Sequence, residues 1–139
     1  MPRLYHSFLK LPQNTRMVLV AIVGSLIGLA TYKLLYWLLP FQPKATICWA
    51  LSFFIGIARQ HGLHRTFTFT YPTPYLKSLY RAYIMYSGSA LVGIIVNFIL
   101  TRIFSVHHLI AWLVCLFTTA GISFLLLQKK VFVPEQNTA

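Results

Sequence analysis

The chain has 139 residues, of which 58% are hydrophobic and 9% charged, and its 12 Lys and Arg residues face one acidic residue, for a net charge of +11. This composition excludes a disordered chain, argues against a soluble globule, and leaves too few polar residues for the solvated surface that a nucleic-acid-binding protein needs. The single acid, Glu135, also excludes mechanisms that need paired carboxylates.

Four apolar stretches follow one another along the chain, at residues 17–39, 45–63, 82–104 and 109–127. A membrane-spanning helix needs about 20 mostly apolar residues. The first, third and fourth stretches meet this requirement. The second meets it only when it extends to about Leu63, which brings Arg59 and His61 to the membrane edge. We therefore expect an all-α membrane protein with four transmembrane helices in one membrane domain over residues 1–139.

The basic residues predict the orientation of these helices. With four spans, the N-terminal arm, the central loop and the C-terminal tail lie on one side of the membrane. These regions hold most of the basic residues, namely Arg3, Lys10, Arg16, Arg59, Arg65, Lys77, Arg81, Lys129 and Lys130. Because Lys and Arg concentrate in cytoplasmic segments, we expect a multi-pass protein of the inner (plasma) membrane with both termini in the cytoplasm.

The sequence also contains an internal repeat. Residues 45–69 align with residues 108–132 at an offset of 63, which pairs Trp49 with Trp112 and Phe69 with Phe132, and Gly24-Ser25 aligns with Gly88-Ser89 at an offset of 64. We interpret this as two tandem helical hairpins, about 16–69 and 81–132, with the same topology. Such repeats are related by an axis along the membrane normal, so alternating access through an inverted repeat is not expected within one chain.

Small residues recur at helix-contact spacing, as Gly24-xxx-Gly28, Ser52-xxx-Gly56 and Ser89-xxx-Gly93. They predict close packing of membrane helices, within one chain or between two copies, and a lipid-lined groove is the alternative. Four short helices enclose little volume, so we expect a homodimer.

Cys48 and Cys115 lie inside apolar stretches and are expected to be small buried residues without a disulfide.

The end of each hairpin resembles a motif of the GtrA-like membrane proteins, roughly Asn-Phe-x-x-Asn-Arg-x-aromatic-Val-Phe. The first copy reads Gln60-His-Gly-Leu-His64-Arg65-Thr-Phe67-Thr-Phe69, and the second runs from Ser123-Phe124 through Gln128-Lys129-Lys130 to Val131-Phe132. Both Asn positions are replaced in both copies. The resemblance extends over about residues 15–133.

This resemblance implies a function in the synthesis of surface polysaccharide or glycolipid. Relatives are thought to move a polyprenyl-phosphate-linked monosaccharide from the cytoplasmic to the outer leaflet of the membrane. They often act beside the membrane glycosyltransferase that makes this lipid. That enzyme and the lipid-linked sugar are therefore the expected partners, together with the bilayer itself.

A basic cluster at the end of the second span is the candidate site. His61 and Arg65 are four residues apart and share a helix face with His64 beside them, whereas Arg59 points elsewhere. A phosphodiester suits the planar guanidinium, although these side chains could instead extend toward lipid headgroups. The candidate residues for lipid-phosphate and sugar binding are Arg59, Arg65, His61, His64, Lys129, Lys130, Gln128 and Arg81.

The sequence holds no Walker motif, no acid pair and no Ser-His-Asp set, so we expect no enzymatic activity, cofactor or metal. Our first hypothesis is an uncoupled translocase of polyprenyl-phosphate-linked monosaccharide. The alternative is a membrane adaptor that docks a polyprenyl-phosphate glycosyltransferase without moving lipid.

Residues 66–71 alternate Thr with aromatic residues, which predicts an extended segment at the membrane interface.

Overall fold

The computed structural model describes residues 8–68 and 74–131, with the side chains of the last helix described as far as Ile122. Within these ranges the protein is helical and contains no strand, as the sequence predicts. The long helices are α2 (Gln13–Leu38), α3 (Lys44–Phe67), α4 (Tyr75–Phe98) and α5 (His108–Val131). A π-helical turn, η1 (Ile99–Ile103), continues α4 without a break.

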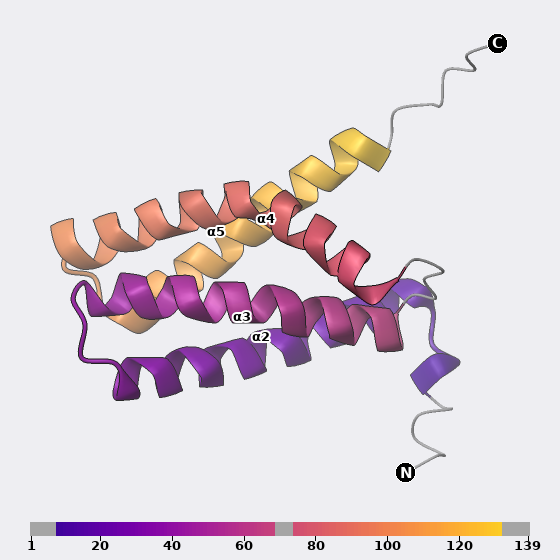
Figure 1. Cartoon of the computed structure of the whole chain (residues 1–139), viewed down its shortest axis with the longest axis horizontal. Helices are drawn as coiled ribbons and strands as arrows, with labels where there is room; N and C mark the ends of the chain where they lie inside the picture. Colours follow the sequence, from indigo (N-terminus) through magenta and orange to yellow (C-terminus); the bar gives the residue numbers. More distant parts are fainter. Residues whose placement is uncertain (1–7, 69–73, 132–139) are drawn as a thin grey trace.

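The helices run up and down beside one another (Figure 1). α2 packs against α3, α3 against α4, and α4 against α5. The α2–α3 and η1–α5 connections lie at one end of the bundle, which we call the connection end. The opposite end, where α2 begins and α3 and α5 finish, is called the terminal end (Figure 1).

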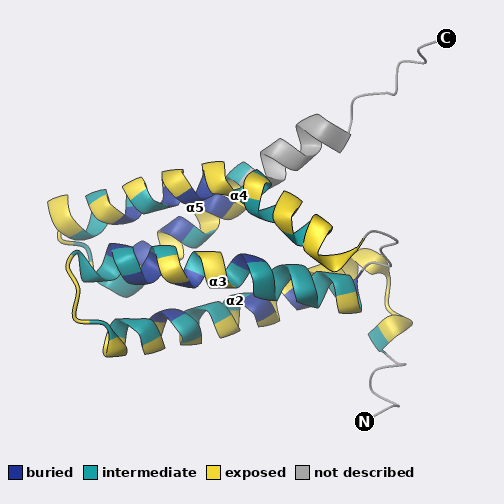
Figure 2. Ribbon diagram, in the orientation of Figure 1, coloured by how far each residue is buried: buried dark blue, intermediate teal, exposed yellow. Residues whose placement is uncertain are grey.

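The outer surface of the bundle is apolar. α2 and the continuous helix Tyr75–Ile103 are both long and apolar enough to cross a membrane, and only 17% and 22% of their apolar windows are buried. The core helix of a soluble protein would be mostly buried, whereas these helices expose large side chains such as Leu26 and Leu91. Figure 2 shows exposed positions along both helices. The apolar part of α5 within the described residues, His108–Ile122, is shorter.

The buried core lies toward the connection end of the bundle. It consists of Tyr32, Cys48, Trp49, Trp112 and Cys115, which come from α2, α3 and α5. Both cysteines are free thiols, as the sequence predicts. Thr46, Ser52 and Ile57 are also buried on α3, so the face of this helix that meets its neighbours combines small and polar residues with Trp49 and a single aliphatic side chain.

Two tryptophans pack onto glycines of a neighbouring helix. Trp49 of α3 lies against Gly93 of α4 so closely that a Cβ at residue 93 would overlap its ring. Trp112 of α5 reaches Gly28 of α2, where a Cβ would lie 4.0 Å from Trp112 Cζ2, at van der Waals contact. The small residues therefore bring helices together within the chain, by accepting the flat ring of a tryptophan.

One local prediction is wrong. Residues 66–71 were expected to be extended, but α3 continues through Phe67 and Thr66 Oγ1 donates a hydrogen bond of 2.9 Å to the Gly62 carbonyl. Bonding of this hydroxyl to the preceding turn is common for Thr in helices. Residues 69–71 lie outside the described ranges, so the prediction remains open there.

Replacing Gly93 by Ala should destabilise the bundle, because the new methyl group would push the Trp49 ring out of its place. Overpacking of this kind costs about 1–3 kcal/mol, and we expect a lower melting temperature for the detergent-solubilised protein. Gly88→Ala on the same helix is the matched control, since a Cβ at Gly88 meets no atom within 4 Å. Equal melting temperatures for the two variants would contradict the proposed contact.

Candidate functional site at the terminal end of α3

The predicted basic cluster lies on the last turns of α3, where polar residues face two different neighbours. Arg59 and Gln60 turn toward α2, whereas His61 and Arg65 turn toward α4. This division follows from the helical period, which rotates each residue by about 100° from the one before it. The side chains therefore form two groups on opposite sides of α3.

Arg59 is held in the contact between α2 and α3. Its Nη2 donates a hydrogen bond of 3.0 Å to the Gly24 carbonyl, and its Nη1 lies 3.4 Å from Thr31 Oγ1. Gly28 gives the guanidinium the space it needs, since a Cβ there would lie 3.1 Å from Nη2. The Arg59 Nε is buried and has no hydrogen-bond partner among the described residues. The charge is thus stabilised by a carbonyl and a hydroxyl rather than by a carboxylate.

Gln60 and His64 form a second link on the same side. The Gln60 amide nitrogen lies 2.9 Å from His64 Nε2 and 3.5 Å from the Val20 carbonyl. Since an amide nitrogen only donates, His64 accepts at Nε2 and its Nδ1 donates to Thr68 Oγ1 at 3.2 Å. Burial, and secondly the neighbouring His61, lowers the pKa of His64, which agrees with a neutral ring.

His61 and Arg65 meet on the α4 side around one hydroxyl group. His61 Nε2 lies 3.0 Å from Ser78 Oγ, and Arg65 Nη1 donates to the same oxygen at 3.2 Å. Ser78 Oγ itself donates to the Tyr75 carbonyl at 2.9 Å, so it accepts from both basic side chains. The Arg65 guanidinium also lies 5.7 Å from the centre of the Tyr75 ring, within the range of a cation–π contact.

The other predicted site residues are not placed in either group. Arg81 is exposed on α4, and no hydrogen bond connects it to the groups around Arg59 and Arg65 within the described residues. The side chains of Gln128, Lys129 and Lys130 lie outside the part of α5 whose side chains are described. Their assignment therefore stays a prediction.

Several residues of the site were not predicted from the sequence. Thr31, Ser78 and Tyr75 each hold an arginine, yet isolated Ser, Thr and Tyr residues carry no signal in one sequence. Gly24 and Gly28 were identified, but as a helix–helix contact rather than as the places where Gln60 and Arg59 lie. Arg16 also belongs here, since its Nη1 donates to the Phe67 carbonyl at 3.1 Å and so binds the end of α3.

No acidic side chain is available to these cations in the described parts of the chain, because the single acid is Glu135. Every positive group described at the site is bonded to a carbonyl, a hydroxyl or an aromatic face. The site therefore retains its positive charge, and an anion of suitable shape would be attracted to it.

The chain matches the family model of the GtrA/DPMS transmembrane domain over residues 16–132. It belongs to this family. The match covers both segments of the predicted repeat and confirms the resemblance to GtrA-like proteins. Comparison with curated proteins and with solved structures gives no match. Membership of the GtrA/DPMS family makes this a membrane protein with a role in handling polyprenyl-phosphate-linked sugars.

Arg59 offers a test of whether the half-buried guanidinium is needed for folding. Replacing Arg59 by Met keeps an unbranched, flexible side chain and removes a charge whose insertion into a membrane helix costs about 2.5–3.5 kcal/mol at the centre. We expect a melting temperature in detergent at or above that of the wild type. Arg102→Met at the connection end, where the side chain is exposed, is the control. A strongly lowered melting temperature for Arg59→Met alone would assign Arg59 to the stability of the α2–α3 contact.

Proposed function

We propose that this GtrA/DPMS family member is an uncoupled translocase that moves a polyprenyl-phosphate-linked monosaccharide from the cytoplasmic to the outer leaflet, for the synthesis of surface polysaccharide or glycolipid. The observation that carries the proposal is the pair of cationic groups on α3, set in an apolar bundle without an acid in the described residues. Such groups suit a lipid that is itself anionic and apolar. The protein would act without enzymatic activity, cofactor or metal.

The phosphodiester would bind first at Arg65 and His61. Ser78 and the Tyr75 ring hold the Arg65 guanidinium through Nη1 and one face, which leaves further N–H donors for two phosphate oxygens. Charge-assisted hydrogen bonds of this type contribute roughly 1.5–3 kcal/mol each. Arg59 and Gln60 lie deeper along α3 and would receive the headgroup as it enters the bundle. In this proposal His64, Gln128, Lys129, Lys130 and Arg81 complete the cytoplasmic rim.

The proposed membrane architecture has four spans in two tandem hairpins, about 16–69 and 81–132, within one domain of residues 1–139. The packing of the tryptophans supports it. Trp49 of the first hairpin packs on Gly93 of the second, and Trp112 of the second hairpin packs on Gly28 of the first. Trp49 aligns with Trp112 in the repeat, and Gly28 with Gly93 when one residue is inserted. A second copy of the chain would enlarge the enclosed volume, so we propose a homodimer.

The translocase is tested in sealed proteoliposomes that contain the purified full-length protein and a labelled polyprenyl-phosphate monosaccharide. We expect the wild type to bring the label to the opposite leaflet. Arg65→Ala should weaken binding of this lipid at least tenfold, about 1.4 kcal/mol. Arg65→Lys should recover only part of this loss, because lysine keeps the charge but lacks the bidentate fork. Lys77→Ala, an exposed basic residue at the same end, is the matched control.

Two results would argue against the proposal. Normal binding and transport by well-folded Arg59→Ala and Arg65→Ala variants would show that these arginines do not form the substrate site. They would then serve as contacts to lipid headgroups. Normal lipid binding combined with loss of a copurifying glycosyltransferase would favour the adaptor, which docks that enzyme without moving lipid.

The proposed orientation can be tested separately. Both termini should lie in the cytoplasm, on the side of the inner membrane that carries most of the basic residues. A C-terminal fusion to a reporter that is active only outside the cytoplasm should therefore be inactive, whereas a cytoplasmic fluorescent reporter should be active. Strong activity of the first fusion would contradict the orientation derived from charge.

A further inference from the structure

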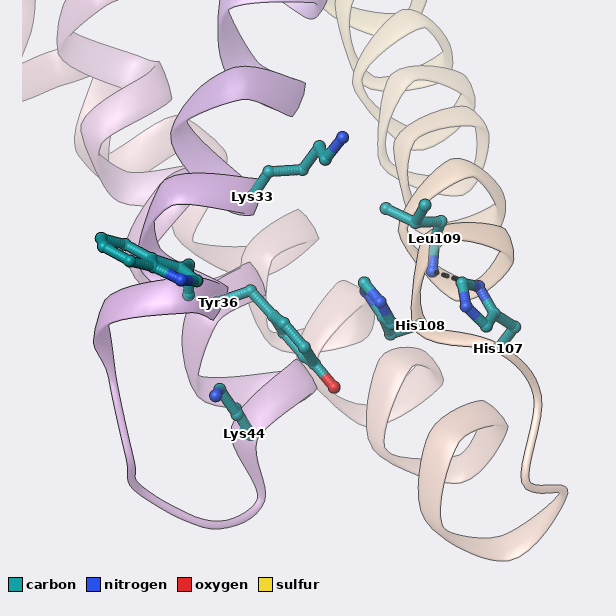
Figure 3. Close-up of a pocket in the computed structure, with 7 residues that line it drawn as sticks. Lys33, Tyr36, Lys44, His107, His108 and Leu109 are labelled. Atoms are coloured by element: carbon teal, nitrogen blue, oxygen red, sulfur yellow. Dashed lines mark hydrogen bonds between the residues drawn. The ribbon is translucent and has the colours of Figure 1, made fainter.

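The connection end of the bundle contains a hollow that belongs to neither group of the site at the terminal end. Its volume is about 440 Å³, and it lies between α2, the start of α3 and the start of α5. Figure 3 shows Lys33, Tyr36 and Lys44 on one side of it and His107 and His108 on the other. Pockets of about 300–1,000 Å³ are typical of small-molecule sites.

The walls of the hollow are joined by contacts between side chains. The rings of Tyr36 and His108 are stacked, with their centres 4.0 Å apart and an interplanar angle of 5°. Lys44 Nζ lies 4.9 Å from the centre of the Tyr36 ring, and Tyr32 Oη lies 3.2 Å from His108 Nδ1. These contacts connect α2, α3 and α5, so the positions of Lys44 and His108 are set before a ligand arrives.

The charged side chains that line the hollow are all positive. Lys33 and Lys44 line it, and no acidic residue occurs in the described ranges. A smaller hollow of about 200 Å³ adjoins it, shares Tyr36, Lys44 and His108, and adds Arg102. Arg102 is directed there by a hydrogen bond of 3.1 Å from its Nη2 to Gln42 Oε1. Lys33 therefore lines the larger hollow, Arg102 lines the smaller one, and Lys44 lines both.

We propose that this hollow is a second anion site, which binds the phosphate-bearing headgroup of a membrane lipid at the connection end. Lys33, Lys44 and Arg102 would contact the phosphate, and the exposed ring of Trp37 would contact the apolar side of an attached sugar. Trp37 is 79% exposed on the outside of α2, where a lipid can enter from the bilayer. The proposal rests on the proposed function, because it makes this hollow the place where the translocated lipid is released.

The site can be measured through the fluorescence of Trp37. The chain has three tryptophans, and Trp49 and Trp112 are 3% and 9% exposed, so a ligand in the hollow should mainly change the emission of Trp37. The full-length protein in nanodiscs is titrated with a short-chain prenyl-phosphate hexose. We expect a saturable change that the double variant Lys33→Ala/Lys44→Ala shifts at least tenfold to higher concentration. The matched control is Lys10→Ala/Lys77→Ala, two exposed lysines at the terminal end, and Trp37→Phe should remove the signal.

Competitors distinguish the sources of the phosphate. Displacement by prenyl phosphate or by phosphatidylglycerol, but not by inorganic phosphate, assigns the hollow to a lipid headgroup. Equal displacement by millimolar inorganic phosphate assigns it to free anions and overturns the lipid-headgroup proposal.

Two further results separate this proposal from the proposed function. An unchanged titration of the Lys33→Ala/Lys44→Ala variant, while the wild type translocates lipid, would overturn the second site and leave the translocase standing. If the Lys33→Ala/Lys44→Ala variant shifts the Trp37 titration tenfold but the wild type translocates no lipid, the second site would be supported and the translocase function would be contradicted.

Discussion

The lack of acidic residues governs how this bundle accommodates its charge. With 12 basic residues and one acid that lies beyond the described helices, the ion pairs that normally neutralise charge between membrane helices cannot form there. Arg59 instead donates to a backbone carbonyl of α2, and Arg65 to a serine hydroxyl of α4. Such partners satisfy hydrogen bonds without cancelling charge, so the interior remains attractive to anions.

Glycine makes this solution possible. In lipid, helices associate through close packing rather than through the hydrophobic effect, and small residues allow backbones to approach. Here the glycines of α2 and α4 receive large side chains from other helices: Gly24 receives Gln60, Gly28 receives Arg59, and Gly93 receives Trp49. A side chain at Gly28 would press on the Arg59 guanidinium. The same backbone positions therefore determine both the packing of the helices and the place of the charge.

The sequence predicted the helical class, the family and the burial of Cys48 and Cys115, because hydropathy and motif spacing are properties of the chain itself. It also predicted that Arg59 and Arg65 point in different directions, which follows from the helical period. It could not show that Ser78 joins His61 to Arg65, since that contact depends on how α4 packs on α3. The end of α3 was misjudged because Thr66 and Phe67 favour strands by propensity, whereas hydrogen bonding to the preceding turn keeps them helical.

An uncoupled translocase needs sites that bind its lipid strongly enough to take it in and weakly enough to release it. Ion channels meet the same requirement with several moderate sites in place of one strong site. The bundle places cationic groups at both ends, with Arg59 between them, and a carbonyl, a hydroxyl and a ring of the protein already partly occupy Arg59, Arg65 and Lys44, respectively. A phosphate must compete with these internal partners, which lowers its net affinity at each position. The described helices also contain no carboxylate that could take up a proton, so the direction of movement would be set by supply of the lipid on one side and its consumption on the other.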